Sequence, residues 1–120
     1  MEGSQGPRRG EVVRVRLDPA EGSEQAGERP ALVLSPDFIN LHSPLVILAA
    51  ITTKKTERVY PFEALVAPPE GGLKQRSKVM LMQIRSVDKR RLLGSIGKVS
   101  PMTMRAVDDA LKIATGLTAV

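Results

Sequence analysis

The sequence predicts an α+β domain in which a small, strongly curved antiparallel β-sheet or barrel is followed by one C-terminal helix. Three observations support this class. Short runs rich in β-type residues recur through the first hundred positions, turn residues separate them, and the one clear helical pattern comes last. Strands followed by a helix, without regular alternation of the two, are typical of α+β folds. A chain of 120 residues is long enough for one such domain.

The first two strands are expected at 11–17 and 30–35. In the first, apolar residues occupy every second position and arginines lie between them, which is typical of a half-buried strand. Asp18-Pro19 ends this strand, and a polar loop then runs to Glu28. Pro30 is predicted to be the first residue of the second strand, where its missing N–H is tolerated.

Three more strands are predicted in the middle of the chain. After a loop over 36–43, the continuous apolar run 44–51 indicates a central strand buried on both faces. A strand is also expected over 56–65, where Pro61 favours an edge position or a bulge. A turn-rich loop over 68–72 then precedes an alternating strand at 78–84.

The C-terminal part ends in the best-defined element. Ser86 is expected to cap a short helical turn that ends at Gly94, and a last strand is expected at 95–99. Ser100 is a good N-cap for the final helix, Pro101 suits its first position, and Gly116 suits its end. The apolar face of this helix is formed by Met104, Val107, Leu111 and Ala114.

Composition excludes several classes of protein. Apolar residues make up 42% of the chain and charged residues 26%, which is an ordinary balance for a soluble protein. Without cysteine there is neither a disulfide nor a thiolate metal site, which fits a cytoplasmic location. No apolar run is long enough to cross a membrane. Residues 1–8 are predicted to be a disordered lead-in without a signal peptide, and residues 9–118 to form the single domain.

The net charge of +5 is distributed unevenly. Positions 74 to 98 contain eight basic residues and only one acidic residue, Asp88. Such a patch favours a polyanion or an acidic protein as partner, although a solvated basic surface fits equally well. For the run 89–91, contact with a nucleic acid, contact with an acidic protein and exposure to solvent are equally compatible with the sequence.

Few residues of the chain have the chemistry of a catalytic site. His42 is the only histidine, the acids are isolated, and no phosphate-binding loop or dinucleotide motif is present. We therefore expect no metal and no cofactor. A guanidinium, hydroxyls and carboxylates remain, and this set suits a phosphodiester. RNA cleavage needs no further nucleophile, because the 2′-OH of the substrate attacks the phosphorus, and DNA lacks that group.

Two stretches, 22–30 and 49–55, place such groups beside runs that are predicted to be buried strands. If the two stretches are neighbours in the folded barrel, Arg29 and Thr52 share one phosphate.

Three motifs resemble the MazF/PemK family of mRNA interferase toxins. They are Gly22-Ser23-Glu24-Gln25-x-Gly27-x-Arg29-Pro30, which follows Arg9-Gly10-Glu11-Val12 and Leu17-Asp18-Pro19; Ala49-Ala50-Ile51-Thr52; and Gln83-Ile84-Arg85-Ser86-Val87-Asp88-Lys89-x-Arg91-Leu92. The match is collinear and covers about residues 8 to 117. It implies an SH3-like barrel with a C-terminal helix. It also implies a homodimer that cleaves single-stranded mRNA at short sequences without metal, leaving 2′,3′-cyclic phosphate and 5′-OH ends.

The resemblance also implies site residues and partners. Arg29 and Thr52 take the places of the catalytic arginine and threonine of the family, and Glu24 matches an acidic position. Arg29 is a poor proton acceptor, because its pKa lies far above neutral pH, so Glu24 is the better candidate for the general base. The candidates for RNA contact are Gln25, Asn40, Gln83 and Arg85. The implied partners are a MazE-type antitoxin and operator DNA, the latter bound by the antitoxin–toxin complex.

Two other hypotheses remain. One is a non-enzymatic inhibitor of a DNA topoisomerase on the same fold, as in CcdB-type proteins. The other is a catalytically silent relative that binds RNA or protein. The chain also departs from the family in its few aromatic residues: 12–15 read Val-Val-Arg-Val where relatives often carry Trp or Tyr. The means of base stacking is therefore open.

Overall fold

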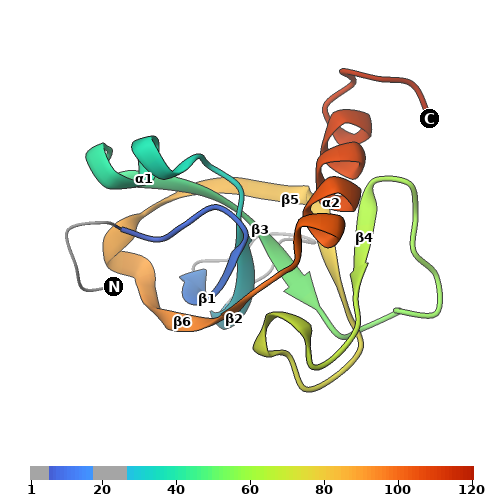
Figure 1. The fold of residues 1–120 in the computed structure, drawn as a ribbon, viewed down its shortest axis with the longest axis horizontal. Coiled ribbons are helices and arrows are strands. Elements are labelled where there is room, and N and C mark those ends of the chain that lie inside the picture. The colour runs from blue at the N-terminus through green and yellow to red at the C-terminus, as the bar shows by residue number, and fades with distance from the viewer. Residues whose placement is uncertain (1–5, 18–26) are drawn as a thin grey trace.

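The computed structural model describes residues 6–17 and 27–120. Six strands form one antiparallel, curved sheet in the order β4-β5-β3-β2-β1-β6 (Figure 1). The strands are β1 Glu11–Leu17, β2 Gly27–Val33, β3 Leu45–Thr52, β4 Glu63–Val66, β5 Ser77–Asp88 and β6 Leu92–Lys98. The helices are α1 Asp37–His42 and α2 Pro101–Ala114, with single 3-10 turns η1 Glu70–Gly72 and η2 Lys89–Arg91. The α+β class with a C-terminal helix is confirmed.

Alternation along the strands sends apolar side chains to both faces of the sheet. In the pairing of β2 with β3, Leu32 lies opposite Ala49 and Val33 lies opposite Leu48. The first pair belongs to one buried cluster and the second pair to another. Since paired residues point to the same side of a sheet, the two clusters occupy opposite faces. The prediction that β3 is a central strand is confirmed, and both of its faces are buried from Leu48 to Thr52.

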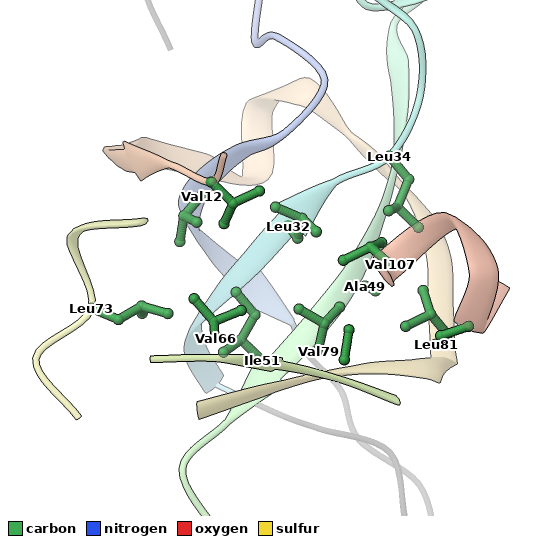
Figure 2. Packing of buried hydrophobic residues seen from close by; sticks show 13 residues of the cluster. Val12, Leu32, Leu34, Ala49, Ile51, Val66, Leu73, Val79, Leu81 and Val107 are labelled. Atoms are coloured by element: carbon green, nitrogen blue, oxygen red, sulfur yellow. The ribbon is translucent and has the colours of Figure 1, made fainter. Parts of the chain in front are cut away.

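The first cluster lies under α2. Val107 and Ala110 of this helix are buried in it, and the helix packs on β4 and β5 (Figure 1). The cluster takes side chains from β1 to β5, from α2 and from the connecting residues Leu34, Leu73 and Val99. Figure 2 shows these side chains gathered around a common space. The second cluster, on the other face, contains Val13, Val15 and Leu17 of β1, as the alternation predicted.

Three elements differ from the sequence prediction. The loop over 36–43 contains α1, which is only six residues long and shows no apolar periodicity. The strand expected over 56–65 is confined to β4, because the backbone bends and turns at 53–57 and turns again at 61–62. Ser86 caps nothing: β5 continues to Asp88, whose side chain caps η2 by accepting a hydrogen bond from the Arg90 N–H.

Glycine and proline positions also differ from expectation. Gly94 lies inside β6, with φ of 151°, instead of ending a helix. Pro30 is the fourth residue of β2 instead of its first residue. The pairing between β2 and β3 begins after it, at Ala31, which fits the absence of a proline N–H.

A bulge interrupts β5 beside β3. Ala49 pairs with Ile84, but Ile51 pairs with Val79, so the partner strand has extra residues between these two pairs. As a result Val79, Leu81 and Ile84 all pack against the first cluster, which strict alternation does not allow. The sequence pattern 78–84 predicted the strand but not this shift of face.

Both ends of α2 follow the predicted signals. The Ser100 Oγ accepts a hydrogen bond from the Thr103 N–H at 3.2 Å, and Pro101 opens the helix. At the other end Gly116 has φ of 79°, and its N–H donates to the Ile113 carbonyl while the Leu117 N–H donates to Lys112. This pair of bonds is a Schellman motif.

Glu70 ties η1 to the start of α2. Its carboxylate accepts hydrogen bonds from the Ser100 N–H at 2.7 Å and the Thr103 hydroxyl at 3.0 Å. Burial raises the pKa of this carboxyl, but the hydrogen bonds from Ser100 and Thr103 together outweigh burial, and the net pKa is lowered. The carboxylate therefore stabilises the folded state above its ordinary pKa, and this contribution is lost as the pH falls.

We expect Glu70→Gln to lower the free energy of unfolding by about 1 kcal/mol at pH 7, because the charge and one good acceptor are lost. Chemical denaturation of both proteins between pH 3 and pH 7 measures this. The gap between wild type and variant should shrink as the pH falls through the acidic range. A gap that stays constant would show that the ionised carboxylate contributes nothing.

The predicted lead-in is only partly described. Residues 1–5 lie outside the described residues, but Pro7 is buried, and the Arg8 N–H donates to Glu11 at 2.8 Å. Arg9 also bonds through its backbone to Asp37 of α1. Residues 6–8 thus pack with the domain. In the described ranges, neither α-helix has the length and apolar character that a bilayer crossing requires.

Candidate active site

Arg29 and Thr52 lie at the same end of two paired strands. Along β2 and β3 the paired residues run from Val33 with Leu48 to Ala31 with Ala50, where the pairing ends. Arg29 and Thr52 each lie two residues beyond the last pair, where β2 begins and β3 ends. By alternation from Ala31 and Ala50, both side chains belong to the face of the sheet that carries the second cluster.

Thr52 is the last residue of β3, where the chain turns away from the sheet. Its side chain is only 7% exposed, and its Oγ1 accepts a hydrogen bond from the Lys54 N–H at 3.1 Å. This bond fixes the hydroxyl oxygen and leaves its proton available to donate. Thr53 is exposed beyond the strand end.

Arg29 is partly buried in β2, opposite Val15 of β1. It helps to line a pocket of about 320 Å³ between β1, β2 and the η1 region. The other lining residues are Arg14, Glu28, Pro30, Gly72, Leu73, Lys74 and Ile96. Next to it in sequence, Glu28 bonds to Arg14 at 2.7 Å and lies 3.9 Å from Arg16. The Glu28 carboxylate is thus engaged with two other arginines.

The sequence prediction missed Lys78, which extends the same row across the sheet. Thr52 pairs with Lys78 of β5. The Lys78 ammonium donates to the Glu63 carboxylate at 2.9 Å and to the Arg58 carbonyl at 3.0 Å. The two charged side chains are only 6% and 11% exposed. In the sequence Lys78 stands out only as one member of the basic patch. Its carboxylate partner, Glu63, lies fifteen positions away, so no local pattern indicates the ion pair.

Two of the predicted RNA contacts lie on this same face of the sheet. Arg85 pairs with Leu48, whose side chain belongs to the second cluster, so Arg85 points to the face that carries Thr52. Alternation from Ile84 places Gln83 there as well. Both side chains are partly exposed. Since Leu48 and Thr52 are four residues apart, Arg85 lies about 13 Å along the strands from the Thr52 position.

Asn40 does not reach a surface on which it could contact RNA. It is completely buried in α1, and its side chain exchanges two hydrogen bonds with Ser35: the Ser35 hydroxyl donates to Oδ1 at 2.5 Å, and Nδ2 donates to the Ser35 carbonyl at 2.9 Å. Its polar side chain thus supports the turn into α1, and the expected RNA contact is corrected. Glu24 and Gln25 lie outside the described residues.

The basic run 89–91 divides into structural and exposed groups. The Lys89 ammonium donates to the Asn40 carbonyl at 2.6 Å and so supports α1. Arg90 is exposed and pairs with Asp88, and its hydrogen bonds lower the pKa of that carboxyl. Arg90 and Arg91 also line a pocket of about 420 Å³ with Arg16, Asp88 and Leu93. Arg90 and Arg91 are therefore the residues of this run that a partner can reach in the pocket.

The site contains the groups that phosphodiester chemistry uses. Arg29 supplies a guanidinium, which can hold two phosphate oxygens, and Thr52 supplies a hydroxyl that is aimed by the backbone. In the described part of the chain no three histidine or carboxylate side chains come close enough to hold a metal ion. A guanidinium and a hydroxyl can both stabilise negative charge that develops on a phosphate.

A protein-family model described as PemK-like, MazF-like toxin of type II toxin–antitoxin system matches residues 8–115. The chain belongs to this family. The match includes both strands that carry Arg29 and Thr52. The resemblance drawn from three short motifs is therefore confirmed over nearly the whole chain.

Individual MazF proteins are similar in sequence and structure. Endoribonuclease MazF9 of Mycobacterium tuberculosis is 41% identical over 110 residues, which cover 88% of this chain and 93% of that protein. The structure of a mycobacterial endoribonuclease in complex with its cognate antitoxin superimposes with a TM-score of 0.78 and 29% identity, covering 96% of this chain and all of that one. The MazE–MazF crystal structure (Form-II) from Deinococcus radiodurans gives a TM-score of 0.73 and 29% identity over 93% and 97% of the two chains.

Proposed function

We propose that this MazF-family chain is an endoribonuclease that cleaves single-stranded mRNA at short, specific sequences without a metal ion. The observation that supports the proposal most is that Arg29 of β2 and Thr52 of β3 lie at the same end of these strands, each two residues beyond the last pair, Ala31 with Ala50. One phosphate placed between these strands meets a guanidinium and a fixed hydroxyl at once. The endoribonuclease name of the 41% identical relative supports the same activity.

In the proposed reaction the 2′-OH of the RNA attacks the adjacent phosphorus. The bond between O2′ and phosphorus forms, and the bond between phosphorus and O5′ breaks. Glu24 accepts the 2′-OH proton, Arg29 stabilises the charged intermediate and gives a proton to the leaving O5′, and Thr52 donates to a phosphate oxygen. The products are a 2′,3′-cyclic phosphate and a 5′-OH, and proton exchange with water restores both side chains. Gln83 and Arg85 contact the RNA farther along the same face.

We further propose that the chain works as a cytoplasmic homodimer that a MazE-type antitoxin inhibits. A groove of about 350 Å³ lined mainly by apolar residues supports an interface between copies. The lining residues are Leu34, Ser35, Pro36, Ile47, Ile84, Leu111, Thr115 and Leu117. Related structures are described as complexes with an antitoxin. Binding of the antitoxin–toxin complex to operator DNA is a further expectation from the family resemblance.

The test is to incubate the purified protein with a long RNA of mixed sequence in EDTA, with single-stranded DNA of the same sequence beside it. We expect cuts at a few recurring short sequences in the RNA and none in the DNA. RNA that stays intact over many sequences contradicts the proposal. Growth arrest that survives without RNA cleavage, together with binding to a topoisomerase, would support the CcdB-type alternative.

A further inference from the structure

The three aromatic residues of this chain lie outside the two buried clusters, and two of them lie in the segment that follows Thr52. Phe38, Tyr60 and Phe62 are the only aromatics in the sequence. The two buried clusters consist of aliphatic residues and methionine. Tyr60 and Phe62 lie in the segment that joins β3 to β4 (Figure 1), and their rings stack with centroids 5.4 Å apart and planes within 1°. Tyr60 is 43% exposed.

A guanidinium accompanies the exposed ring. The carbon centre of the Arg58 guanidinium lies 5.8 Å from the centroid of Tyr60, and its Nη1 donates to the Tyr60 hydroxyl at 3.2 Å. Aromatic rings and arginine guanidinium planes are the two surfaces on which proteins stack unpaired nucleobases. Arg58 and Tyr60 thus form a stacking platform from neighbouring side chains of one loop.

A pocket of about 340 Å³ lies at this platform. It is lined by Lys55, Glu57, Arg58, Tyr60 and Lys78. Its volume is within the usual range for sites that take small molecules. The lining carries three basic side chains and one acidic side chain, and Glu63, outside the lining, neutralises Lys78. The pocket thus combines a ring and a guanidinium for stacking with a positive charge that suits the RNA backbone.

Polar contacts with Lys78 and Glu63 hold the platform against the sheet. The Lys78 ammonium donates to the Arg58 carbonyl at 3.0 Å and lies 5.8 Å from the Tyr60 centroid. The Glu63 carboxylate accepts from the Tyr60 N–H at 3.0 Å and pairs with Lys78. Since Lys78 is paired with Thr52 across the strands, the anchor of the platform lies about one strand spacing, or roughly 5 Å, from the Thr52 backbone.

We propose that this pocket receives a nucleobase of the RNA strand whose phosphate lies at Arg29 and Thr52, and that the base stacks on the Arg58–Tyr60 platform. Lys78 and Glu63 act as positioning residues for the platform. The inference rests on the proposed RNA cleavage and adds to it the place where one unpaired base is held. It also accounts for base stacking in a chain whose first strand lacks aromatic residues.

Tyr60 itself supplies the probe for the test. It is the only tyrosine, and the chain has no tryptophan, so tyrosine fluorescence of the full chain reports on this pocket alone. The ligand is a mixed-sequence single-stranded RNA with 2′-O-methyl groups, which cannot be cleaved because the attacking hydroxyl is blocked. Anisotropy of a dye on the same oligonucleotide measures binding independently, and free tyrosinamide corrects for light absorbed by the RNA.

We expect tyrosine emission to fall saturably, with the same midpoint as the rise in anisotropy. Binding that leaves the emission unchanged overturns the inference, and so does quenching by a polyglutamate peptide but not by the RNA. Cleavage of ordinary RNA is measured in parallel. If RNA is cleaved but tyrosine emission does not change, the proposed function stands and the base pocket is wrong. If emission falls but RNA is not cleaved, the pocket stands and the proposed endoribonuclease activity is wrong. Absence of RNA binding overturns both.

Variants give a second readout in the cleavage reaction. We expect Tyr60→Leu to raise KM for RNA roughly tenfold, since stacking contributes this much per base, whereas Tyr60→Phe keeps the ring and restores KM to near the wild-type value. Phe38→Leu is the matched control, because Phe38 is also an exposed aromatic, at 66%, but lies on α1. Equal KM values for Tyr60→Leu and Phe38→Leu contradict the base pocket.

Discussion

Replacing Arg29 with alanine should abolish measurable RNA cleavage while the protein stays folded. Loss of a single positioned donor to a charged transition state typically lowers kcat by a factor of roughly 100 to 1000, and Arg29 is proposed both to stabilise charge and to give the leaving oxygen its proton. Arg29→Lys should recover only part of the rate, because an ammonium holds phosphate without the planar fork of a guanidinium. Single-turnover cleavage of a labelled RNA, together with thermal unfolding, measures both effects.

The matched control for Arg29→Ala is Arg105→Ala. Arg105 is an exposed residue of α2, so its removal changes the net charge of the protein equally but leaves the ends of β2 and β3 unchanged. We expect this control to cleave at a rate within about threefold of wild type, since only long-range attraction of the RNA is weakened. If both variants lose activity equally, net charge explains the loss and the role assigned to Arg29 is wrong.

The largest expected effect on stability is that of Lys78→Met. Methionine keeps most of the volume but leaves the Glu63 carboxylate buried without its cation, and the Arg58 carbonyl loses a donor. Breaking a buried ion pair by removing one partner typically costs about 3–5 kcal/mol. Urea denaturation should therefore show a decrease in the free energy of unfolding of about 3 kcal/mol.

Two further variants distinguish loss of the ion pair from an unspecific loss of stability. Lys74→Met makes the same substitution at an exposed position and should change stability by less than about 0.5 kcal/mol. In Lys78→Met combined with Glu63→Gln, the unpaired charge is removed while an acceptor for the Tyr60 N–H remains. This double variant should be more stable than Lys78→Met alone. If it is less stable by the full sum of both changes, the two charges do not interact.

Much of the fold is predictable because its signals are local. Ser100, Pro101 and Gly116 determine the ends of α2 within a few residues of themselves, and each makes the expected contact. The alternation in β1 and the continuous apolar run of β3 likewise indicate how each strand is buried. These patterns depend on the burial of neighbouring side chains and not on distant partners.

The rest depends on contacts that no local pattern contains. The bulge in β5 arises from its pairing with β3, so the sequence did not indicate that Leu81 and Ile84 share a face. Asn40 looked like an exposed loop amide, but Ser35 satisfies its side chain inside the protein. The burial of Lys78 was not predictable for the same reason, because its carboxylate partner, Glu63, comes from β4. Arg29 and Thr52 needed the family motifs to single them out, and the pairing of β2 with β3 to place them at one end of the sheet.

The most direct test of the central claim uses an RNA with one 2′-deoxynucleotide immediately 5′ to a mapped cleavage point. Wild-type protein is incubated in EDTA with this RNA and with the all-ribose RNA, and the ends are identified by their chemistry. The account predicts cleavage of the all-ribose RNA to a 2′,3′-cyclic phosphate and a 5′-OH, and no cleavage at the substituted position. Cleavage at the deoxynucleotide, or cleavage that requires a divalent metal, would contradict it.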